Sequence, residues 1–385
     1  MFKRELEEKL KEAVQSFPGV LLTGPRQSGK TTLLRHMFPD FEYVLLESPD
    51  VLLEIRNDPR LFLEKEVSGW IIDEAQVYPE LFSYLQEYLD AKNAKPLILT
   101  GSQNFLLSQR IGQSLAGRVA VLELLPLSIS EITRRPGFES IELFDLMLGG
   151  QYPRPYHEKL PVSLWYQSYI QTYLERDVRQ ISQVGDLAQF QLFLKLCAGR
   201  TGQILNLESL GADVGISQPT AKRWLSILNS SRITFLLQPH FKNFKKRLVK
   251  RPKLYFYDTC VICGLLGIKS KNELLSHSMR GAIFESLIIS EIAKGCYNDA
   301  DIPSIYFWRD HRGLEVDCVI DLAGSLKGVE IKSAKTLSKD FSSSILKWSQ
   351  IAGLPKDSLR IVYGGDLEKT LDGISVSPWN ARRFF

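Results

Sequence analysis

The chain has 385 residues, of which 44% are hydrophobic and 24% charged, and its formal net charge is +4. This length suffices for two or three domains, and the composition is that of a globular protein rather than a disordered or fibrous one. The longest apolar runs, such as residues 261–268, are far shorter than the roughly 20 residues that span a bilayer. We therefore expect no membrane partner.

The N-terminal residues 1–14 mix charges of both signs, and their apolar residues recur at helical spacing. They predict an amphipathic helix and not a secretory signal. The five cysteines are scattered and odd in number, which argues against a disulfide framework and favours a cytoplasmic location. Cys260 and Cys263 form a C-x-x-C pair. Without a second pair at metal-ligand spacing, we interpret them as small core residues rather than a zinc or redox site.

The stretch 19–38 predicts a short buried strand, a glycine-rich loop and a helix. Within it, residues 24–31 have the spacing G-x-x-x-x-G-K-[ST] in that strand-loop-helix context. The glycines let backbone N–H groups surround a β-phosphate, the lysine neutralises the β- and γ-phosphates, and the Thr31 hydroxyl ligates Mg²⁺. We therefore predict a site for ATP and Mg²⁺. The predicted nucleotide-binding residues here are Gly24, Pro25, Arg26, Gln27, Ser28, Gly29, Lys30, Thr31 and Thr32.

A second predicted strand begins at residue 69 and ends in Asp73 and Glu74. Asp73 would hold Mg²⁺ through a water molecule, and Glu74 would polarise the attacking water as a general base. Alternatively, the two acids cap the helix that follows. The phosphate-loop motif upstream favours the catalytic interpretation.

A third predicted strand ends in the polar residues Ser102, Gln103 and Asn104. Its tip would lie beside the γ-phosphate, where Ser102 or Asn104 would act as a polar sensor. Arg118 follows Gly117 immediately before another predicted strand. It is a candidate for contacting the γ-phosphate, in its own chain or across the subunit boundary of a homo-oligomer, and an ordinary surface arginine is an equal alternative.

The order of these motifs, followed by Pro-Leu-Ser and Glu131, resembles the AAA+ ATPase superfamily. It resembles most a prokaryotic branch whose C-terminal half is a domain of unknown function. The resemblance continues through residues 149–156, 169–180 and 253–261 and through the segments beyond them, so it covers nearly the whole chain. It implies an intracellular protein that binds and hydrolyses ATP, and it implies no settled biological role.

Residues 206–237 predict a helix-turn-helix. The first helix ends near Asp213, Gly215 makes the turn, Ser217 is a suitable N-cap, and Pro219 is tolerated in the first turn. The residues predicted to form the buried face of the second helix are Ala221, Trp224, Leu225 and Leu228. The residues predicted to point outward, as in a recognition helix at a major groove, are Gln218, Lys222, Arg223 and Ser226.

A basic hairpin is predicted next. Residues 214–257 contain ten Lys or Arg and no Asp or Glu, and two strand-like segments bracket the basic run 242–252. Such a hairpin tip would be a wing that contacts the phosphates of nucleic acid, with DNA the expected partner. The alternatives are a protein-binding winged helix and a hairpin that is simply solvated.

The last third of the chain places acidic residues on a helix and two strands. Glu285 lies on a predicted helix with Ile283, Leu287 and Ile288 on its buried face. Strand alternation predicts that Val316, Cys318 and Ile320 share one face, with Glu315, Asp317 and Asp321 on the other. On the next strand, Glu330 and Lys332 share a face.

This order of helix Glu, strand Asp and strand Glu-x-Lys resembles the PD-(D/E)xK nuclease fold. The resemblance implies that Asp317 and Glu330 hold one or two Mg²⁺ ions and that Glu285 reaches the metal from the helix. Lys332 would orient the attacking water or help to deprotonate it. The alternatives are charged residues on a half-exposed sheet, and a nuclease-like fold that does not cut.

Together these patterns predict an α/β chain with three parts. A P-loop AAA+ domain with a parallel sheet would occupy 1–160, a helical and winged-helix domain 161–270, and a nuclease-like domain 271–385. The leading hypothesis is an ATPase whose nucleotide state positions the two later domains on nucleic acid, in DNA processing, mobile-element control or defence. The alternative is an ATP-gated switch whose inactive nuclease-like domain binds a partner.

Overall fold

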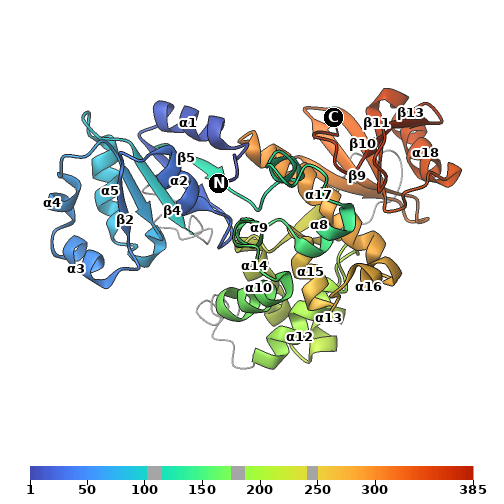
Figure 1. Cartoon of the computed structure of the whole chain (residues 1–385), viewed down its shortest axis with the longest axis horizontal. Coiled ribbons are helices and arrows are strands. Elements are labelled where there is room, and N and C mark those ends of the chain that lie inside the picture. The colour runs from blue at the N-terminus through green and yellow to red at the C-terminus, as the bar shows by residue number, and fades with distance from the viewer. Residues whose placement is uncertain (102–114, 175–186, 241–249, 385) are drawn as a thin grey trace. The chain divides into compact units, whose positions relative to one another are not determined.

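A computed structural model describes residues 1–101, 115–174, 187–240 and 250–384 (Figure 1). The chain forms two compact units, residues 1–126 with 296–301 and residues 127–295 with 302–385. These units differ from the three predicted segments, because one sheet joins strands from both sides of residue 270. Within the described ranges, every helix is too short or too polar to cross a bilayer.

The first unit alternates strands and helices. Its elements are α1 Glu7–Ser16, β1 Gly19–Thr23, α2 Lys30–Met37, β2 Glu42–Leu45, α3 Pro49–Asn57, α4 Pro59–Leu63, β3 Trp70–Asp73, η1 Ala75–Val77, α5 Leu81–Asp90, β4 Leu97–Gly101 and β5 Val119–Glu123. The strands form one sheet in the order β2-β3-β4-β1-β5, and every pair is parallel. The predicted parallel sheet is therefore confirmed. The carboxyl ends of β1, β3 and β4 meet at one edge of this sheet.

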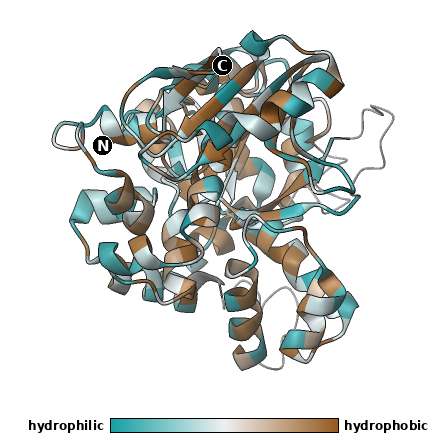
Figure 2. Ribbon diagram, turned by 90° about the vertical axis from the view of Figure 1, so that its right-hand side faces the viewer, coloured by the Kyte–Doolittle hydropathy of each residue, from teal (hydrophilic) through white to brown (hydrophobic). Residues whose placement is uncertain are grey.

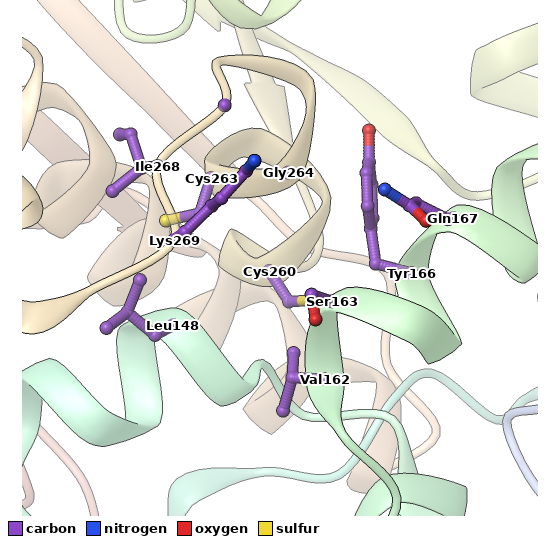
Figure 3. Close-up of a pocket in the computed structure, with 11 residues that line it drawn as sticks. Leu148, Val162, Ser163, Tyr166, Gln167, Cys260, Cys263, Gly264, Ile268 and Lys269 are labelled. Carbon is purple, nitrogen blue, oxygen red and sulfur yellow. The ribbon is translucent and has the colours of Figure 1, made fainter.

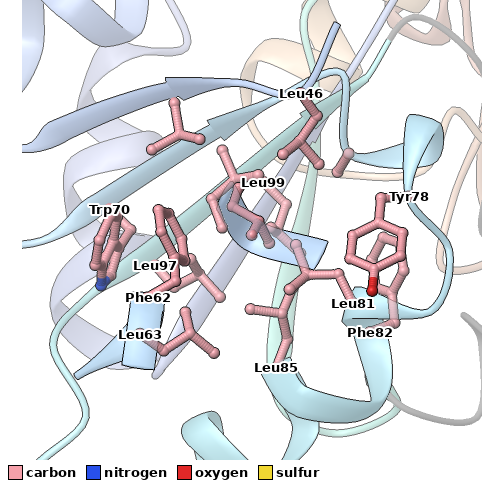
Figure 4. Close-up of a cluster of buried hydrophobic side chains, with 14 of the residues drawn as sticks. Leu46, Phe62, Leu63, Trp70, Tyr78, Leu81, Phe82, Leu85, Leu97 and Leu99 are labelled. Carbon is pink, nitrogen blue, oxygen red and sulfur yellow. The ribbon is translucent and has the colours of Figure 1, made fainter. Parts of the chain in front are cut away.

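The sheet of the first unit is covered on both faces. One face packs against α3, α4 and α5, in a cluster that holds Trp70, Leu97 and Leu99 from the strands and Phe82 and Leu85 from α5 (Figure 4). The other face packs against α1 and α2. The predicted amphipathic helix is confirmed, since its apolar residues Leu6, Leu10 and Ala13 are buried in this second cluster. Strands buried on both faces explain their continuous apolar sequences.

The second unit holds the remaining elements. They are α7 Ile129–Thr133, α8 Leu143–Gly149, α9 Pro153–Glu158, α10 Val162–Tyr169, η3 Ile170–Leu174, α12 Leu187–Ala198, α13 Leu207–Val214, α14 Gln218–Ser230, β6 Thr234–Pro239, β7 Lys253–Phe256, α15 Thr259–Leu265, α16 Lys271–Ser276, α17 Arg280–Asn298, β8 Ile305–Arg309, β9 Glu315–Leu322, β10 Ser325–Lys332, η4 Lys339–Ser342, α18 Ser343–Ala352, η5 Lys356–Ser358, β11 Leu359–Tyr363, β12 Lys369–Leu371 and β13 Ile374–Pro378. Its helices mix hydrophilic and hydrophobic residues along their length (Figure 2).

An eight-stranded mixed sheet organises this unit, in the order β12-β13-β11-β10-β9-β8-β6-β7. The β6–β7 hairpin follows α14, as predicted for a wing, but β6 also pairs in parallel with β8 through Gln238↔Tyr306 and Pro239↔Phe307. The hairpin is therefore the edge of the C-terminal sheet. Trp348 of α18 is buried against this sheet, in a cluster that includes Trp308 and Val316.

Strand β9 departs from strict alternation. Tyr306 pairs with Val319, whereas Trp308 pairs with Val316, so β9 has one extra residue between these pairs. Such a β-bulge shifts the side chains that follow it to the opposite face. The predicted common face of Val316, Cys318 and Ile320 is thus wrong, because Val316 and Val319 pack into the same core cluster. The bulge lies at Asp317, an acidic residue of the candidate site.

Candidate functional site

The phosphate loop lies between β1 and α2. Gly24 has φ +147°, and a Cβ atom there would lie 2.1 Å from the Leu124 carbonyl oxygen, so only glycine fits. Gly29 precedes α2 with φ +97°. Lys30 is buried, and its Nζ donates to the carbonyl oxygens of Gly24 at 2.9 Å and Pro25 at 3.1 Å. The loop thus curls around an ammonium group at the start of a helix, an arrangement suited to phosphate.

Asp73 lies at the carboxyl end of β3, beside this loop. Its Oδ2 accepts a hydrogen bond from the Thr31 hydroxyl at 2.6 Å and from the Tyr43 hydroxyl at 2.9 Å. Its Oδ1 accepts from the Thr100 hydroxyl at 2.8 Å. The structure therefore brings together Thr31 and Asp73, the two residues predicted to hold Mg²⁺. A hydroxyl and a carboxylate oxygen are the hard donors that this ion takes, so the pair fits it.

Glu74 follows Asp73 with φ 55°, in the left-handed region that non-glycine residues seldom adopt. Its Oε2 accepts a hydrogen bond from Gln76 Nε2. The turn places Glu74 at the same sheet edge as the phosphate loop, as expected for a general base.

Arg4 is a residue of this site that the sequence did not suggest. Its side chain is buried, and its guanidinium donates to the Ser28 carbonyl oxygen at 2.9 Å and to the Leu125 carbonyl oxygen at 2.7 Å. It thus ties the phosphate loop to the segment after β5. No motif signals this contact, because Arg4 lies 24 residues before Ser28.

The other two predicted contacts of the nucleotide have different outcomes. Ser102, with Gln103 and Asn104, lies outside the described residues. Arg118 precedes β5, and its carbonyl oxygen accepts from Gly19 N, at the amino end of β1. It therefore lies at the sheet edge opposite the phosphate loop, and its guanidinium forms an ion pair with Asp90 at 2.7 Å. This position does not support a contact with the phosphates in its own chain. The contact across a subunit boundary stays a prediction.

In the second unit, β9 and β10 bring together three of the predicted nuclease residues. Asp317 Oδ2 accepts from Ile331 N at 2.7 Å, so the aspartate reaches across to β10. Glu330 is buried, and its Oε1 pairs with Lys332 Nζ at 2.6 Å. Its second oxygen, Oε2, is buried and has no hydrogen-bond partner among the residues that the structure describes. A buried carboxylate oxygen without a partner is costly and marks a place for a cation or a proton.

The metal set of Glu285, Asp317 and Glu330 stays a prediction. Among the described residues, no three acidic, histidine or cysteine side chains are grouped so that they could hold a metal ion. Glu285 has partners on the hairpin, since its Oε1 accepts from Lys253 Nζ at 3.1 Å and from the Tyr255 hydroxyl. Both donors come from β7, where they lie two residues apart on one face. The two-residue spacing of Lys253 and Tyr255 is visible in the sequence. The sequence does not show that β7 lies beside Glu285, because the predicted boundary at residue 270 separates them.

Burial and mutual repulsion shift the acidity of these carboxylates. Burial raises the pKa of Glu285 to about 7, Lys253 opposes that rise, and Asp317 adds to it. Burial also raises the pKa of Glu330 to about 8, with Asp317 acting in the same direction against Lys332. The pKa of Asp317 rises for the same first reason, although Lys332 and Lys253 oppose the rise. Clusters with such shifts are typical of functional sites.

The predicted helix-turn-helix is present as α13 and α14. Gly215 adopts φ +79° at the turn, and the Ser217 side chain caps α14 by accepting from Thr220 N at 3.3 Å. The predicted buried face is confirmed, with Ala221, Trp224, Leu225 and Leu228 all buried. Gln218, Lys222, Arg223 and Ser226 are exposed, as predicted. Most of the basic tip of the following hairpin, including Phe241 and Phe244, lies outside the described residues.

One buried polar network joins three segments that carry the family resemblance, namely residues 149–156, residues 253–261 and helix α17. Gln151 N donates to Asp258 Oδ2 at 2.6 Å, and its side-chain amide nitrogen donates to Glu291 Oε1 at 2.6 Å. Lys294 Nζ donates to Gln151 Oε1 at 2.6 Å and to the Leu127 carbonyl oxygen at 3.2 Å. The network ties α15 and α17 to the start of the second unit, so we interpret these residues as structural.

The C-x-x-C pair lines a cavity of about 100 Å³ between α8, α10 and α15 (Figure 3). Cys260 and Cys263 are buried free thiols, and burial raises the pKa of Cys263 to about 12. Burial of the pair confirms its interpretation as core residues. Thiols held in the protonated form are poor metal ligands and nucleophiles.

A five-stranded parallel sheet, with its glycine loop after β1 and its Thr31–Asp73 pair at the same edge, defines a P-loop ATPase domain of the AAA class. A family model described as "AAA domain" matches residues 16–133. Two further models match beyond it, "Domain of unknown function (DUF8612)" at 141–272 and "Domain of unknown function (DUF4143)" at 280–381.

The chain belongs to the same family as two mycobacterial proteins. It is 32% identical over 377 residues to "Uncharacterized protein Rv2008c" of Mycobacterium tuberculosis, covering 94% of this chain and 80% of that protein. The values are the same for "Uncharacterized protein Mb2031c" of Mycobacterium bovis. Among solved structures, the chain is similar to the Walker-type ATPase PABY2304 of Pyrococcus abyssi, with 16% identity and a TM-score of 0.48 over 69% of this chain and 96% of that one.

Proposed function

We propose that the chain is an ATP-hydrolysing protein whose second unit acts on nucleic acid, with phosphodiester cleavage as the reaction of the β9–β10 cluster. The observation that carries the cleavage proposal is the buried oxygen of Glu330, beside Asp317 and Lys332, for which the described part of the chain offers no hydrogen-bond partner. We place the protein in the cytoplasm, where its free thiols suit a reducing compartment. A protein with these activities would serve DNA processing, mobile-element control or defence.

The nucleotide site supports hydrolysis through its own residues. Lys30 would neutralise the β- and γ-phosphates, and Thr31 with Asp73 would hold Mg²⁺. Glu74 would orient the attacking water as general base. Arg118, which lies away from the phosphates of its own chain, would serve a neighbouring copy in a homo-oligomer.

The carboxylate cluster fits a divalent cation because its donors are carboxylate oxygens and one of them is buried and unpartnered. Asp317 and Glu330 would hold it, and when bound it would stabilise charge on the phosphodiester. Lys332 is 32% exposed and hydrogen-bonded to Glu330. Its ammonium can therefore orient a water or a phosphate oxygen while staying fixed to the site.

Nucleic acid would reach this unit through its basic elements. Lys222 and Arg223 are exposed on α14, in the place where a recognition helix contacts DNA. The hairpin that would form the wing belongs to the same sheet as Asp317 and Glu330. A nucleic acid held by these elements would thus be held by the unit that carries the cluster.

Two assays test the proposal. Lys30→Ala should abolish ATP turnover, while Lys92→Ala, a change at an exposed lysine of the same unit, should leave it intact. Turnover that survives Lys30→Ala would refute the ATPase assignment.

For cleavage, the purified protein is incubated with Mg²⁺ or Mn²⁺ and with supercoiled DNA, linear DNA or RNA. We expect nicking that Asp317→Asn and Lys332→Ala remove and that exposed Glu368→Gln does not. If the wild type cuts nothing with ATP, with ADP or without nucleotide, the cluster is not a nuclease site, and the ATP-gated switch that binds a partner is the function to pursue.

A further inference from the structure

The carboxylate cluster contains a second lysine, Lys253, which comes from the hairpin. Its side chain is 3% exposed, and its Nζ pairs with Glu285 Oε1 at 3.1 Å and with Glu315 Oε1. The other oxygen of Glu315 pairs with Arg309 at 3.0 Å. Lys253 thus pairs with two of the four acids in the cluster, and Lys332 pairs with a third, Glu330.

Lys253 and Lys332 cannot have the same role. At 3% exposure, the Lys253 ammonium cannot touch a nucleic acid or a reacting water, whereas Lys332 is 32% exposed. The Lys253 charge acts only on its buried neighbours. Together with the Tyr255 hydroxyl, Lys253 Nζ hydrogen-bonds Glu285 Oε1 from β7.

The charges of the cluster set how many cations it can take. Glu285, Glu315, Asp317 and Glu330 with Lys253 and Lys332 give a formal charge of −2. Arg309 is 39% exposed, so solvent screens its contribution. When all four acids are deprotonated, as metal binding requires, one divalent cation balances this charge, and a second would add uncompensated positive charge to a buried site, which is unfavourable.

We propose that Lys253 is a positioning residue that replaces a second metal ion, so that the site takes a single divalent cation between Asp317 and Glu330. This inference rests on the proposed function of that cluster. It accounts for two independent observations. Within the described ranges, Glu330 Oε2 is buried without a partner, and Lys253 Nζ pairs with both Glu285 and Glu315.

The number of bound ions tests the inference without relying on activity. Free Mn²⁺ is measured by electron paramagnetic resonance during titration of the full chain without nucleotide. The double variant Asp317→Asn/Glu330→Gln gives the background from other sites. The wild type should bind one Mn²⁺ per chain above that background. Two would overturn the inference and leave the proposed function standing. No difference would overturn the proposed function itself, and the inference with it.

Variants at Lys253 sharpen the test. Lys253→Met should raise the count from one to two, because Glu285 and Glu315 are then released to a metal. Lys253→Arg keeps the charge and should stay at one. A count of one for folded Lys253→Met would overturn the inference. If that variant does not fold, Lys253→Met/Glu285→Gln restores the formal charge of −2 and should again bind one ion, and a count of two would contradict the proposal.

Discussion

At the scale of single residues, Glu330 couples stability to pH. Its pKa in the folded chain is about 8, above the value of about 4.3 for an unfolded glutamate. The folded state therefore binds the proton more tightly, and this stabilisation is present at low pH and lost as the pH rises through 8. Glu285, whose pKa is raised to about 7, acts in the same direction.

We therefore expect the contribution of Glu330 and Glu285 to the free energy of unfolding of the second unit to decrease as the pH rises from about 4.5 to 8. Glu330→Gln should flatten the pH dependence, and Glu368→Gln, at an exposed site, should not. Urea unfolding from pH 5 to 8.5, without divalent cations, measures both. An unchanged pH dependence in Glu330→Gln would contradict the burial argument.

Arg4 makes a second prediction at this scale. Arg4→Met removes two charge-assisted hydrogen bonds, to the Ser28 and Leu125 carbonyl oxygens. Each such bond contributes about 1.5–3 kcal/mol, so we expect a lower free energy of unfolding and a weaker affinity for ATP. Arg4→Lys keeps the charge but loses the forked guanidinium that donates to both carbonyl oxygens. Its free energy of unfolding and its affinity for ATP should therefore be intermediate. Calorimetric titration with ATP, with Lys3→Met as control, checks this, and an unchanged affinity would exclude a role for Arg4 in shaping the loop.

At the scale of elements, α14 depends on Trp224. Its ring is buried and lies edge-on to Phe190 and Phe193 at 5.3 and 5.4 Å. Trp224→Ala should therefore cost about 3–5 kcal/mol of stability, as large core truncations do. Thermal unfolding measures the loss of stability. Trp224→Phe should lose less stability than Trp224→Ala, because it keeps an aromatic ring in the core. A loss below about 1 kcal/mol would mean that this face of α14 is not a packed core.

The opposite face of α14 gives a prediction about binding. If Lys222 and Arg223 each contact one phosphate, changing both to Glu should weaken DNA binding. The slope of log K against log salt should also become shallower by about 2. Lys195→Glu, at an exposed residue of α12, should change neither by as much. Fluorescence anisotropy between 50 and 300 mM salt tests this. If Lys195→Glu weakened DNA binding as much as the double change at Lys222 and Arg223, binding would depend on the general positive charge of the unit and not on contacts of α14.

Elements with local signals were predictable from the sequence. The phosphate loop follows from spacing and glycine placement, and both faces of α14 follow from its helical period. What could not be predicted depends on pairing between distant strands. The bulge at Asp317 arises from the register of β8 on β9, and Lys253 reaches Glu285 only because β6 pairs with β8. No local pattern encodes either, so the alternation predicted for β9 was wrong and the contact of Lys253 with Glu285 was not predicted.

At the scale of the whole molecule, the first unit is discontinuous, because it is completed by residues 296–301. Asn298 Nδ2 donates to Glu5 Oε2 at 3.1 Å within this unit. A fragment of residues 1–126 should therefore unfold at a lower temperature than the same unit in the full chain. Calorimetry compares the two, and Asn298→Ala in the full chain should cost about 0.5–1.5 kcal/mol. Equal melting temperatures would show that the returning segment adds nothing.

The discontinuity also bears on synthesis. A ribosome that has finished β5 must add about 175 more residues before position 301 exists. At roughly 5–20 residues per second, that delay is about 9–35 s. During this interval the first unit of the nascent chain lacks residues 296–301. Nascent chains of this protein should therefore gain their final resistance to protease late, after most of the second unit has emerged, and not when the last strand of the ATPase sheet is made.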